Sequence, residues 1–317
     1  MKLETLNIGN IKLASPLLLA PMVDVTNLPY RLICRKAGAS LCYTEMIYTS
    51  AILHDNRHTL GMLKTVSRDH PLGLQITGNN LEEFKQLLPF LNSKQSRKSY
   101  NLIDLNCGCP SDKILGNQAG AFLLNDPKKI ANIIKLLKSH DLTVTAKIRL
   151  GYKTNNVLKI AKIIEKSGAD ALTLHPRLAT QGYDSPADYS KLKLIKRSIG
   201  IPLIGNGDVL SEEKAQEILS ICDGAMIARG AIGDPLIFSR INHYLKTGKK
   251  KPFNFKQNIK SFQDYLSLSK KHDLINIASI RHVGSKFIRN IEGAAKLRDQ
   301  LMHLNDLDQI QDFIKNL

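Results

Sequence analysis

Eight short apolar runs recur along the first 230 residues, separated by longer stretches with helical patterning. They are PLLLAPM (16–22), SLCYTEM (40–46), LGLQIT (72–77), LIDLNCG (102–108), TVTAKIRL (143–150), ALTLHPR (171–177), PLIGNGD (202–208) and GAMIARG (224–230). Apolar runs of this length are typical of buried strands, and their alternation with helices indicates βαβ units in a parallel sheet. Eight such units that close on themselves predict a TIM-type (β/α)8 barrel.

Helix start signals between the runs agree with this alternation. Asp126 precedes Pro127, so we expect a helix with Asp126 as N-cap and proline at its first position. Ser211 followed by Glu212 and Glu213 predicts another helix, because a hydroxyl acceptor and two anions stabilise a helix N-terminus.

The pattern changes near residue 250. The basic segment KTGKKKP (246–252) contains glycine and proline, and no strand-like run follows it. From Phe253 to the end the pattern is helical. We therefore expect two domains, a barrel over residues 1–250 and a small all-helical domain over residues 251–317.

Polar residues stand at the ends of the predicted strands. They are Gln75, Asn106, Lys147, His175 and Asn206. Side chains alternate between the lumen and the helices along a barrel strand, and active sites lie at the C-terminal strand ends. Where this alternation can be followed, these residues share the lumen side. Burying several unpaired polar groups together costs a few kcal/mol each. The pattern thus predicts a ligand with several donors and acceptors.

Two glycine-rich loops indicate one end of that ligand. GNGD (205–208) and ARGAIGDP (228–235) follow the seventh and eighth runs, where barrel enzymes hold phosphate groups. Arg229 can neutralise the charge, and the glycines let the backbone come close. No Walker or G-x-G-x-x-G fingerprint accompanies them, which favours a mononucleotide-like cofactor.

The lysine at the predicted mouth leaves two readings of the chemistry. Lys147 suits a flavin, whose ring becomes anionic on reduction, whereas a Schiff-base lysine is the alternative. The amide and imidazole groups of Gln75, Asn106 and His175 suit the edge of a flavin ring. FMN is therefore the expected cofactor.

Composition adds a partner class. The chain has 317 residues, with 45 Lys and Arg against 28 Asp and Glu, for a formal net charge of +17. Such a charge attracts polyanions, chiefly nucleic acid or an anionic membrane surface. No apolar run approaches the ~18 residues of a membrane span, so we expect no membrane segment and a cytoplasmic protein.

The stretch NCGCPSDK (106–113) contains two of the five cysteines. Zinc needs about four ligands, and no second Cys/His pair at finger-like spacing occurs, so we expect no metal. A disulfide between Cys107 and Cys109 would be strained, and a nucleophile would need a base that the sequence does not identify. A thiol that is mostly protonated at neutral pH can donate a proton to a carbanion or enolate. Cys109 is the candidate acid, and Cys107 a small packing residue.

Six stretches together resemble the tRNA-dihydrouridine synthases. They are APMVDVTNLPYR (20–31), NCGCPSDKILGNQAGAFLL (106–124), AKIRLG (146–151), HPRLATQGYDSPAD (175–188), GNGD and ARGAIGDP. The resemblance covers the barrel and continues into the tail. It implies an FMN-binding barrel with a helical tRNA-binding domain that reduces the C5=C6 bond of uridine in tRNA to 5,6-dihydrouridine. NADPH would be the electron source, reduced FMN the hydride donor and Cys109 the proton donor.

The resemblance also assigns residues by position. Flavin contacts fall on Pro21, Met22, Gln75, Lys147 and His175, and the phosphate end on Asn206, Gly207, Asp208, Ala228, Arg229 and Gly230. Substrate or RNA contacts fall on Asn106, Lys113, Arg177, Gln181 and Tyr183. The chain departs from the family at Ala179, where a second arginine is common, and at Cys107, where the family has an apolar residue.

The tail carries an independent pattern. Residues 280–295 place an apolar stripe at helical spacing, with His282, Lys286 and Arg289 on another face. We expect these three residues to contact tRNA.

Two alternatives remain. Another FMN barrel acting on a small pyrimidine, as a dihydroorotate dehydrogenase does, would have no use for the basic helical tail. A non-catalytic RNA-binding protein would not need Cys109, Lys147 and His175. The sequence leaves open which uridine is reduced, whether NADPH or NADH is preferred, and the oligomeric state, for which a monomer is the expectation.

Overall fold

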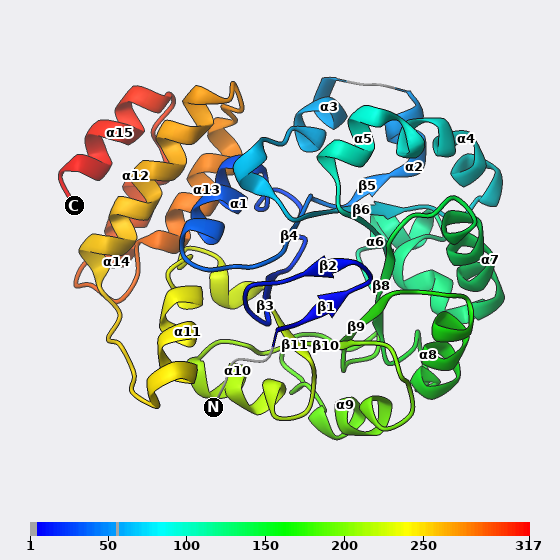
Figure 1. Ribbon diagram of the computed structural model, residues 1–317. Helices are drawn as coiled ribbons and strands as arrows, with labels where there is room; N and C mark the ends of the chain where they lie inside the picture. Colours follow the sequence, from blue (N-terminus) through cyan, green and yellow to red (C-terminus); the bar gives the residue numbers. More distant parts are fainter. Residues whose placement is uncertain (1–4, 55–56) are drawn as a thin grey trace.

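The computed structural model describes residues 5–54 and 57–317 and shows a parallel barrel with a helical C-terminal region (Figure 1). The strands lie in the order β3-β11-β10-β9-β8-β7-β6-β4. Their bounds are β3 Leu17–Leu19, β4 Cys42–Tyr43, β6 Leu72–Thr77, β7 Leu102–Cys107, β8 Val144–Arg149, β9 Ala171–His175, β10 Leu203–Asn206 and β11 Gly224–Ile227. Each predicted apolar run contains one of these strands, so the predicted fold class is confirmed.

The barrel closes between its first two strands. A single parallel bridge joins Leu18 of β3 to Leu41 just before β4. Two backbone hydrogen bonds of 2.9 Å flank it, from the N–H of Leu19 to Leu41 O and from the N–H of Ser40 to Leu17 O. A short strand, β5 (Ile47–Tyr48), pairs with the end of β6 and extends that side of the mouth.

An antiparallel hairpin closes the N-terminal end of the barrel. It is formed by β1 (Asn7–Ile8) and β2 (Ile11–Lys12), and Figure 1 shows it in front of the barrel strands. Ile8 and Leu13 pack with Leu18, Ile204 and Met226 in one buried apolar cluster. Because this apolar cluster fills the N-terminal end of the barrel lumen, a ligand has access from the C-terminal strand ends.

Helices surround the barrel. They are α1 Leu28–Lys36, α2 Thr49–Leu53, α3 Arg57–Leu63, α4 Leu81–Asn92, α5 Lys94–Ser99, α6 Asp112–Gly116, α7 Pro127–Lys138, α8 Val157–Lys166, α9 Tyr189–Lys196, α10 Glu212–Leu219 and α11 Ile237–Thr247, with 3-10 turns η1 Ser67–Asp69, η2 Gly120–Asn125 and η3 Arg229–Ala231. Both predicted N-caps are present, with Asp126 and Ser211 accepting from the third residue along.

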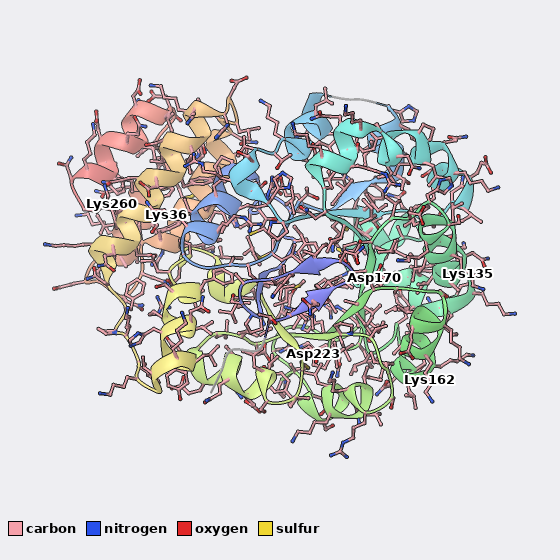
Figure 2. The ribbon with its side chains drawn as sticks, in the orientation of Figure 1. Lys36, Lys135, Lys162, Asp170, Asp223 and Lys260 are labelled. Carbon is pink, nitrogen blue, oxygen red and sulfur yellow. The ribbon has the colours of Figure 1, made fainter. Side chains whose placement is uncertain are left out.

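The outward faces of these helices carry many of the basic side chains. Figure 2 shows Lys135 of α7 and Lys162 of α8 pointing away from the barrel. Asp170 and Asp223 instead accept hydrogen bonds from the first strand residues Val144 and Leu203, at 2.7 and 2.8 Å. Each aspartate also pairs with a lysine, so these carboxylates anchor strand starts. No helix of the described ranges is long and apolar enough to cross a membrane.

Four helices form the C-terminal region: α12 Phe255–Lys271, α13 Ile277–Phe287, α14 Ala294–Met302 and α15 Leu307–Lys315. The expected boundary near residue 250 falls between α11 and α12. The Tyr30 ring of α1 lies edge-on to Tyr265 of α12 and Phe287 of α13, with centroids 5.8 and 6.4 Å apart. The region therefore packs against the barrel at α1, where Figure 1 shows α12 and α13.

Candidate functional site

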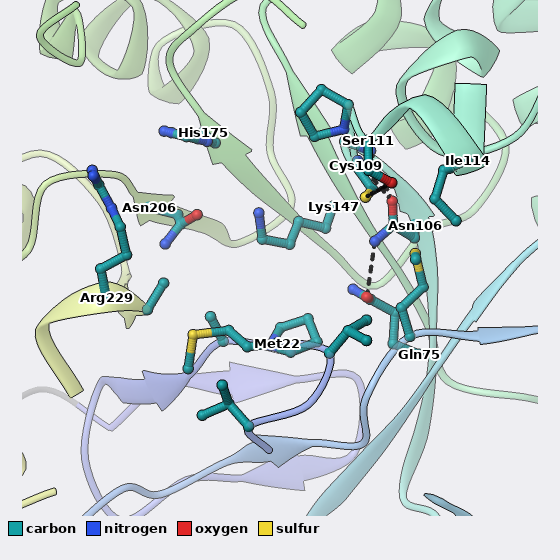
Figure 3. Close-up of a pocket in the computed structure, with 18 of the residues that line it drawn as sticks. Met22, Gln75, Asn106, Cys109, Ser111, Ile114, Lys147, His175, Asn206 and Arg229 are labelled. Atoms are coloured by element: carbon teal, nitrogen blue, oxygen red, sulfur yellow. Dashed lines mark hydrogen bonds between the residues drawn. The ribbon is translucent and has the colours of Figure 1, made fainter. Parts of the chain in front are cut away.

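A cavity of about 780 Å³ opens at the C-terminal strand ends (Figure 3). Sixteen of the residues expected at the site line it: Pro21, Met22, Gln75, Asn106, Cys109, Lys113, Lys147, His175, Tyr183, Asn206, Gly207, Asp208, Ala228, Arg229, Gly230 and His282. Strand-end residues from five strands and both glycine loops thus meet in one pocket, while their roles stay predictions. His282 belongs to α13, so the C-terminal region supplies part of the wall.

A chain of hydrogen bonds crosses the lumen below Cys109. Asn106 Nδ2 donates to Gln75 Oε1 at 2.9 Å, and Gln75 Nε2 donates to Asp104 Oδ2 at 2.7 Å. The hydroxyl of Thr145 donates to the other oxygen of Asp104 at 2.6 Å. Burial raises the pKa of Asp104, and the bonds from Gln75 and Thr145 and the charge of Lys147 oppose that rise. Since an ionised Asp104 can only accept hydrogen bonds, this series of hydrogen bonds fixes the orientation of the Gln75 and Asn106 side-chain amides.

Asn106, one end of this hydrogen-bond series, also holds the loop that carries Cys109. Asn106 Oδ1 accepts from the backbone N–H groups of Gly108 and Cys109 at 3.1 and 3.0 Å. Arg149 Nε donates to Gly108 O at 2.9 Å, and its Nη1 reaches Leu178 O at 2.9 Å. These bonds fix the Cys109 backbone at the pocket mouth.

The two cysteines of this loop have different surroundings. Cys109 is half-buried, with Sγ 3.6 Å from Ser111 Oγ, and lies on the same side of the pocket as Asn106 in Figure 3. Cys107 is fully buried in the main core, and burial raises its pKa well above the usual value. Only Cys109 can reach a ligand in the pocket.

Lys147 lies between the two sides of the pocket. Figure 3 shows its side chain between the Cys109 and Asn106 group and the His175, Asn206 and Arg229 group. Its ammonium has no hydrogen bond or ion pair to any residue that the structure describes. Burial, followed by the charge of Arg149, lowers the pKa of Lys147 to about 8, although Asp104 opposes this shift. An anionic ligand would supply the missing partner.

The far end of the pocket is rich in arginine. The carboxylate of Asp208 accepts from Arg177 Nη2 at 2.6 Å and from Arg229 Nη2 at 2.8 Å. Burial alone would raise the pKa of Asp208, but the bonds from Arg177 and from the N–H of Ala187, with the charge of Arg229, hold it below its usual value. The Arg229 guanidinium also lies 3.9 Å from the ring centre of Tyr183. Asp208 therefore orients Arg229 at the pocket rim.

Four residues expected to contact substrate or RNA do not line the pocket. Arg177 is 1% exposed and bonded to protein groups. Gln181 is exposed and caps the N–H of Leu178 at 2.6 Å. Lys286 is exposed on α13, and Arg289 pairs with Asp234 at 2.7 Å. Contacts of these four with RNA stay predictions.

Other lining residues were not expected from the sequence. Arg149 follows Lys147 by two residues on β8, so both side chains lie on the same side of the strand. The alternation along the strand could therefore have predicted that Arg149 lines the pocket. Met46, Tyr48 and Ile114 pack with Cys109 at one side of the pocket, and His58 also lines it. All four come from short or irregular segments without a clear periodicity. Among the residues described, no group of three or more His, Cys, Asp or Glu side chains could hold a metal ion.

Comparison with known proteins identifies the family. The sequence model of the dihydrouridine synthase (Dus) family matches residues 18–316. The chain belongs to this family. It is 37% identical over 256 residues to a probable tRNA-dihydrouridine synthase of Rickettsia bellii, covering 78% of this chain and 76% of that protein. It is 31% identical over 315 residues to tRNA-dihydrouridine synthase B of Pseudomonas aeruginosa, covering 96% and 93%. The family expected from the sequence motifs is confirmed.

Solved structures share the fold. An old yellow enzyme homologue from Zymomonas mobilis superimposes with a TM-score of 0.56 at 12% identity, covering 83% of this chain and 98% of that chain. Histamine dehydrogenase from Rhizobium gives a TM-score of 0.54 at 15% identity, covering 78% and 48%. At these identities the likeness supports the barrel fold alone.

Proposed function

We propose that this member of the dihydrouridine synthase family is an FMN-dependent enzyme that reduces uridine in tRNA to 5,6-dihydrouridine, with NADPH as electron donor. The observation that carries the proposal is one pocket that holds an accessible Cys109 thiol, a Lys147 ammonium with no partner among the described residues, and Arg229 at its rim. The relatives named as tRNA-dihydrouridine synthases support the substrate.

The donor set fits FMN. Lys147 offers a cation in the middle of the pocket, and His175 and Gln75 add polar groups to the same pocket. Arg229, Gly230 and Gly207 suit the phosphate, because glycines expose backbone N–H groups and arginine adds charge. When bound, reduced FMN supplies the hydride for the C5=C6 bond of uracil.

The chain's own residues would complete the reaction. Asn106 holds the Cys109 backbone, so the loop that carries the thiol has a fixed position at the mouth. After hydride addition to uracil, the enolate takes the proton of the Cys109 thiol at carbon, and the thiolate that remains regains a proton from solvent. The uridine must leave its stack to reach this depth, which agrees with a pocket that opens at the barrel end.

The C-terminal region is proposed to bind the tRNA. His282 on α13 lines the pocket, and exposed Lys286 lies one turn further along the same helix. A helix that both walls the pocket and carries cations can guide an RNA backbone toward it.

The test is product formation with defined components. The purified protein should bind about one FMN per chain and, with NADPH, convert uridine to dihydrouridine in unmodified tRNA, measured by mass spectrometry of digested RNA. A protein that fails to take up FMN, or an FMN-loaded protein that reduces a free pyrimidine but no tRNA, would overturn the proposal.

A further inference from the structure

One arginine holds the imidazole of His175 and determines which ring nitrogen carries the proton. Arg177 Nη1 lies 2.9 Å from His175 Nε2. A guanidinium has only N–H donors and stays protonated, so Nε2 must accept this hydrogen bond. The single proton of a neutral His175 ring is therefore on Nδ1.

Arg177 itself is fixed by other protein groups. Its Nε donates to Ser185 O at 2.6 Å, and its Nη2 donates to Asp208 Oδ2 at 2.6 Å. The side chain is 1% exposed. Because each of the three guanidinium nitrogens is hydrogen-bonded inside the protein, Arg177 cannot move away from His175 Nε2.

The ring is also held in place and kept neutral. Tyr183 stacks on it with centroids 6.2 Å apart, and the backbone of Gly207 lies so close that a Cβ there would be 2.7 Å from His175 Cδ2. Burial lowers the pKa of His175 far below its usual value, and the charges of Lys147, Arg149, Arg177 and Arg229 act in the same direction.

Nδ1 faces the pocket. It has no partner among the described residues, and it is not one of their buried unpaired polar atoms, so it opens to the cavity that the ring lines. We propose that Arg177 is a positioning residue that locks His175 as the neutral Nδ1–H tautomer and so presents one N–H donor to the ligand. Only the identity of that ligand as flavin rests on the proposed function.

Nitrogen NMR of histidine-labelled full-length protein, with and without FMN, reads the tautomer directly. His175→Asn assigns the signal. The wild type should show Nδ1–H and bare Nε2 at neutral pH, and Arg177→Met should show a mixture of tautomers or a ring that protonates on mild acidification. Arg149→Met is the matched control, since it removes a nearby charge without touching Nε2, and should keep pure Nδ1–H. An Nε2–H or doubly protonated ring in the wild type overturns the proposal, even where Arg177→Met does not fold, as does a pure Nδ1–H ring in Arg177→Met.

A double-mutant cycle then tests the consequence for binding. The side-chain amide introduced by His175→Asn places an N–H donor near the Nδ1 position but has no tautomers. Arg177→Met should weaken FMN binding by about threefold to tenfold more in the native background than in the His175→Asn background. Equal losses in both backgrounds would mean that Arg177 acts through Asp208 and Arg229 instead. Failure of the wild type to bind FMN would sink the proposed function and leave the tautomer result standing.

Discussion

Arg289 and Asp234 form an ion pair of 2.7 Å that ties the segment after α13 to the loop after β11. Asp234 is almost fully buried and also pairs with Arg240 of α11 at 2.6 Å. The sequence pattern assigned Arg289 to an RNA-binding face, whereas this pair gives it a structural contact. The same loop contains Arg229 and Gly230, so one ion pair holds both the C-terminal region and the loop that carries the expected phosphate site.

Replacing Arg289 by Met should therefore reduce stability. The change leaves the buried Asp234 carboxylate with one cation instead of two, and we expect the free energy of unfolding to fall by about 1–2 kcal/mol. Chemical denaturation of the full chain measures this. Lys286→Met is the matched control: its side chain is exposed, so stability should change by less than about 0.5 kcal/mol.

The same two variants should differ in the salt dependence of their affinity for tRNA. Lys286→Met should lower the slope of log affinity against log salt by about 1, as expected for the loss of one phosphate contact. An Arg289→Met protein with unchanged stability and a reduced salt slope would instead assign Arg289 to the RNA.

The barrel and most of the pocket followed from the sequence because both depend on simple periodicity. Buried parallel strands need continuous apolar runs, and the lumen side of each strand repeats every second residue, so Gln75, Asn106, Lys147 and His175 could be placed together. Strands β1, β2 and β5 span two residues each and, unlike the equally short β4, have no separate apolar run that marks them in the sequence.

Contacts made after an element ends could not be predicted. Arg177 lies two residues after His175, so a continuous strand would place both side chains on the lumen side. However, β9 ends at His175 and the following segment turns, so the Arg177 side chain is buried against Asp208. The apolar stripe over residues 280–295 predicts one continuous helix, whereas α13 ends at Phe287 and α14 begins at Ala294. Arg289 therefore leaves the helical face on which periodicity placed it.

Gly120→Ala should disturb the cysteine loop. Gly120 has φ of +58°, and a Cβ there would lie 2.5 Å from Ile114 Cγ2 and 2.8 Å from Cys109 O. We expect a loss of about 1–3 kcal/mol in unfolding free energy and slower product formation. Gly116→Ala, in α6, should be neutral or stabilising by up to about 1 kcal/mol, because an added Cβ would meet no described atom within 4 Å beyond its own chain neighbours and helix backbone. Equal stability of both variants would contradict the close packing around Cys109.

FMN binding should weaken as pH rises through about 8, where Lys147 loses its proton. Burial and Arg149 disfavour the ammonium, so its charge is present below that pH and absent above it. Titration of FMN fluorescence at a series of pH values measures the affinity. Lys147→Met should bind FMN more weakly and lose this step, and Lys147→Arg should keep its charge throughout. A step that persists in Lys147→Met would assign it to another group.

Cys109→Ala should block the protonation of uracil and leave the earlier steps of the reaction intact. The thiol is accessible in the pocket, yet neither FMN binding, tRNA binding nor flavin reduction by NADPH requires its proton. Loss of one positioned acid costs about a hundred- to ten-thousandfold in rate, so dihydrouridine formation should fall by that factor while flavin reduction stays near normal. Stopped-flow absorbance and mass spectrometry of the tRNA follow the two stages separately.

Cys107→Ala is the control for this experiment, because Cys107 lies two residues away and is fully buried in the core. Removing its sulfur should cost about 1 kcal/mol in stability and leave turnover close to that of the parent. If Cys107→Ala were the inactive variant, or if Cys109→Ala formed dihydrouridine at the normal rate, the proton would come from elsewhere. His175 would then be the next candidate, since its Nδ1 opens to the same pocket.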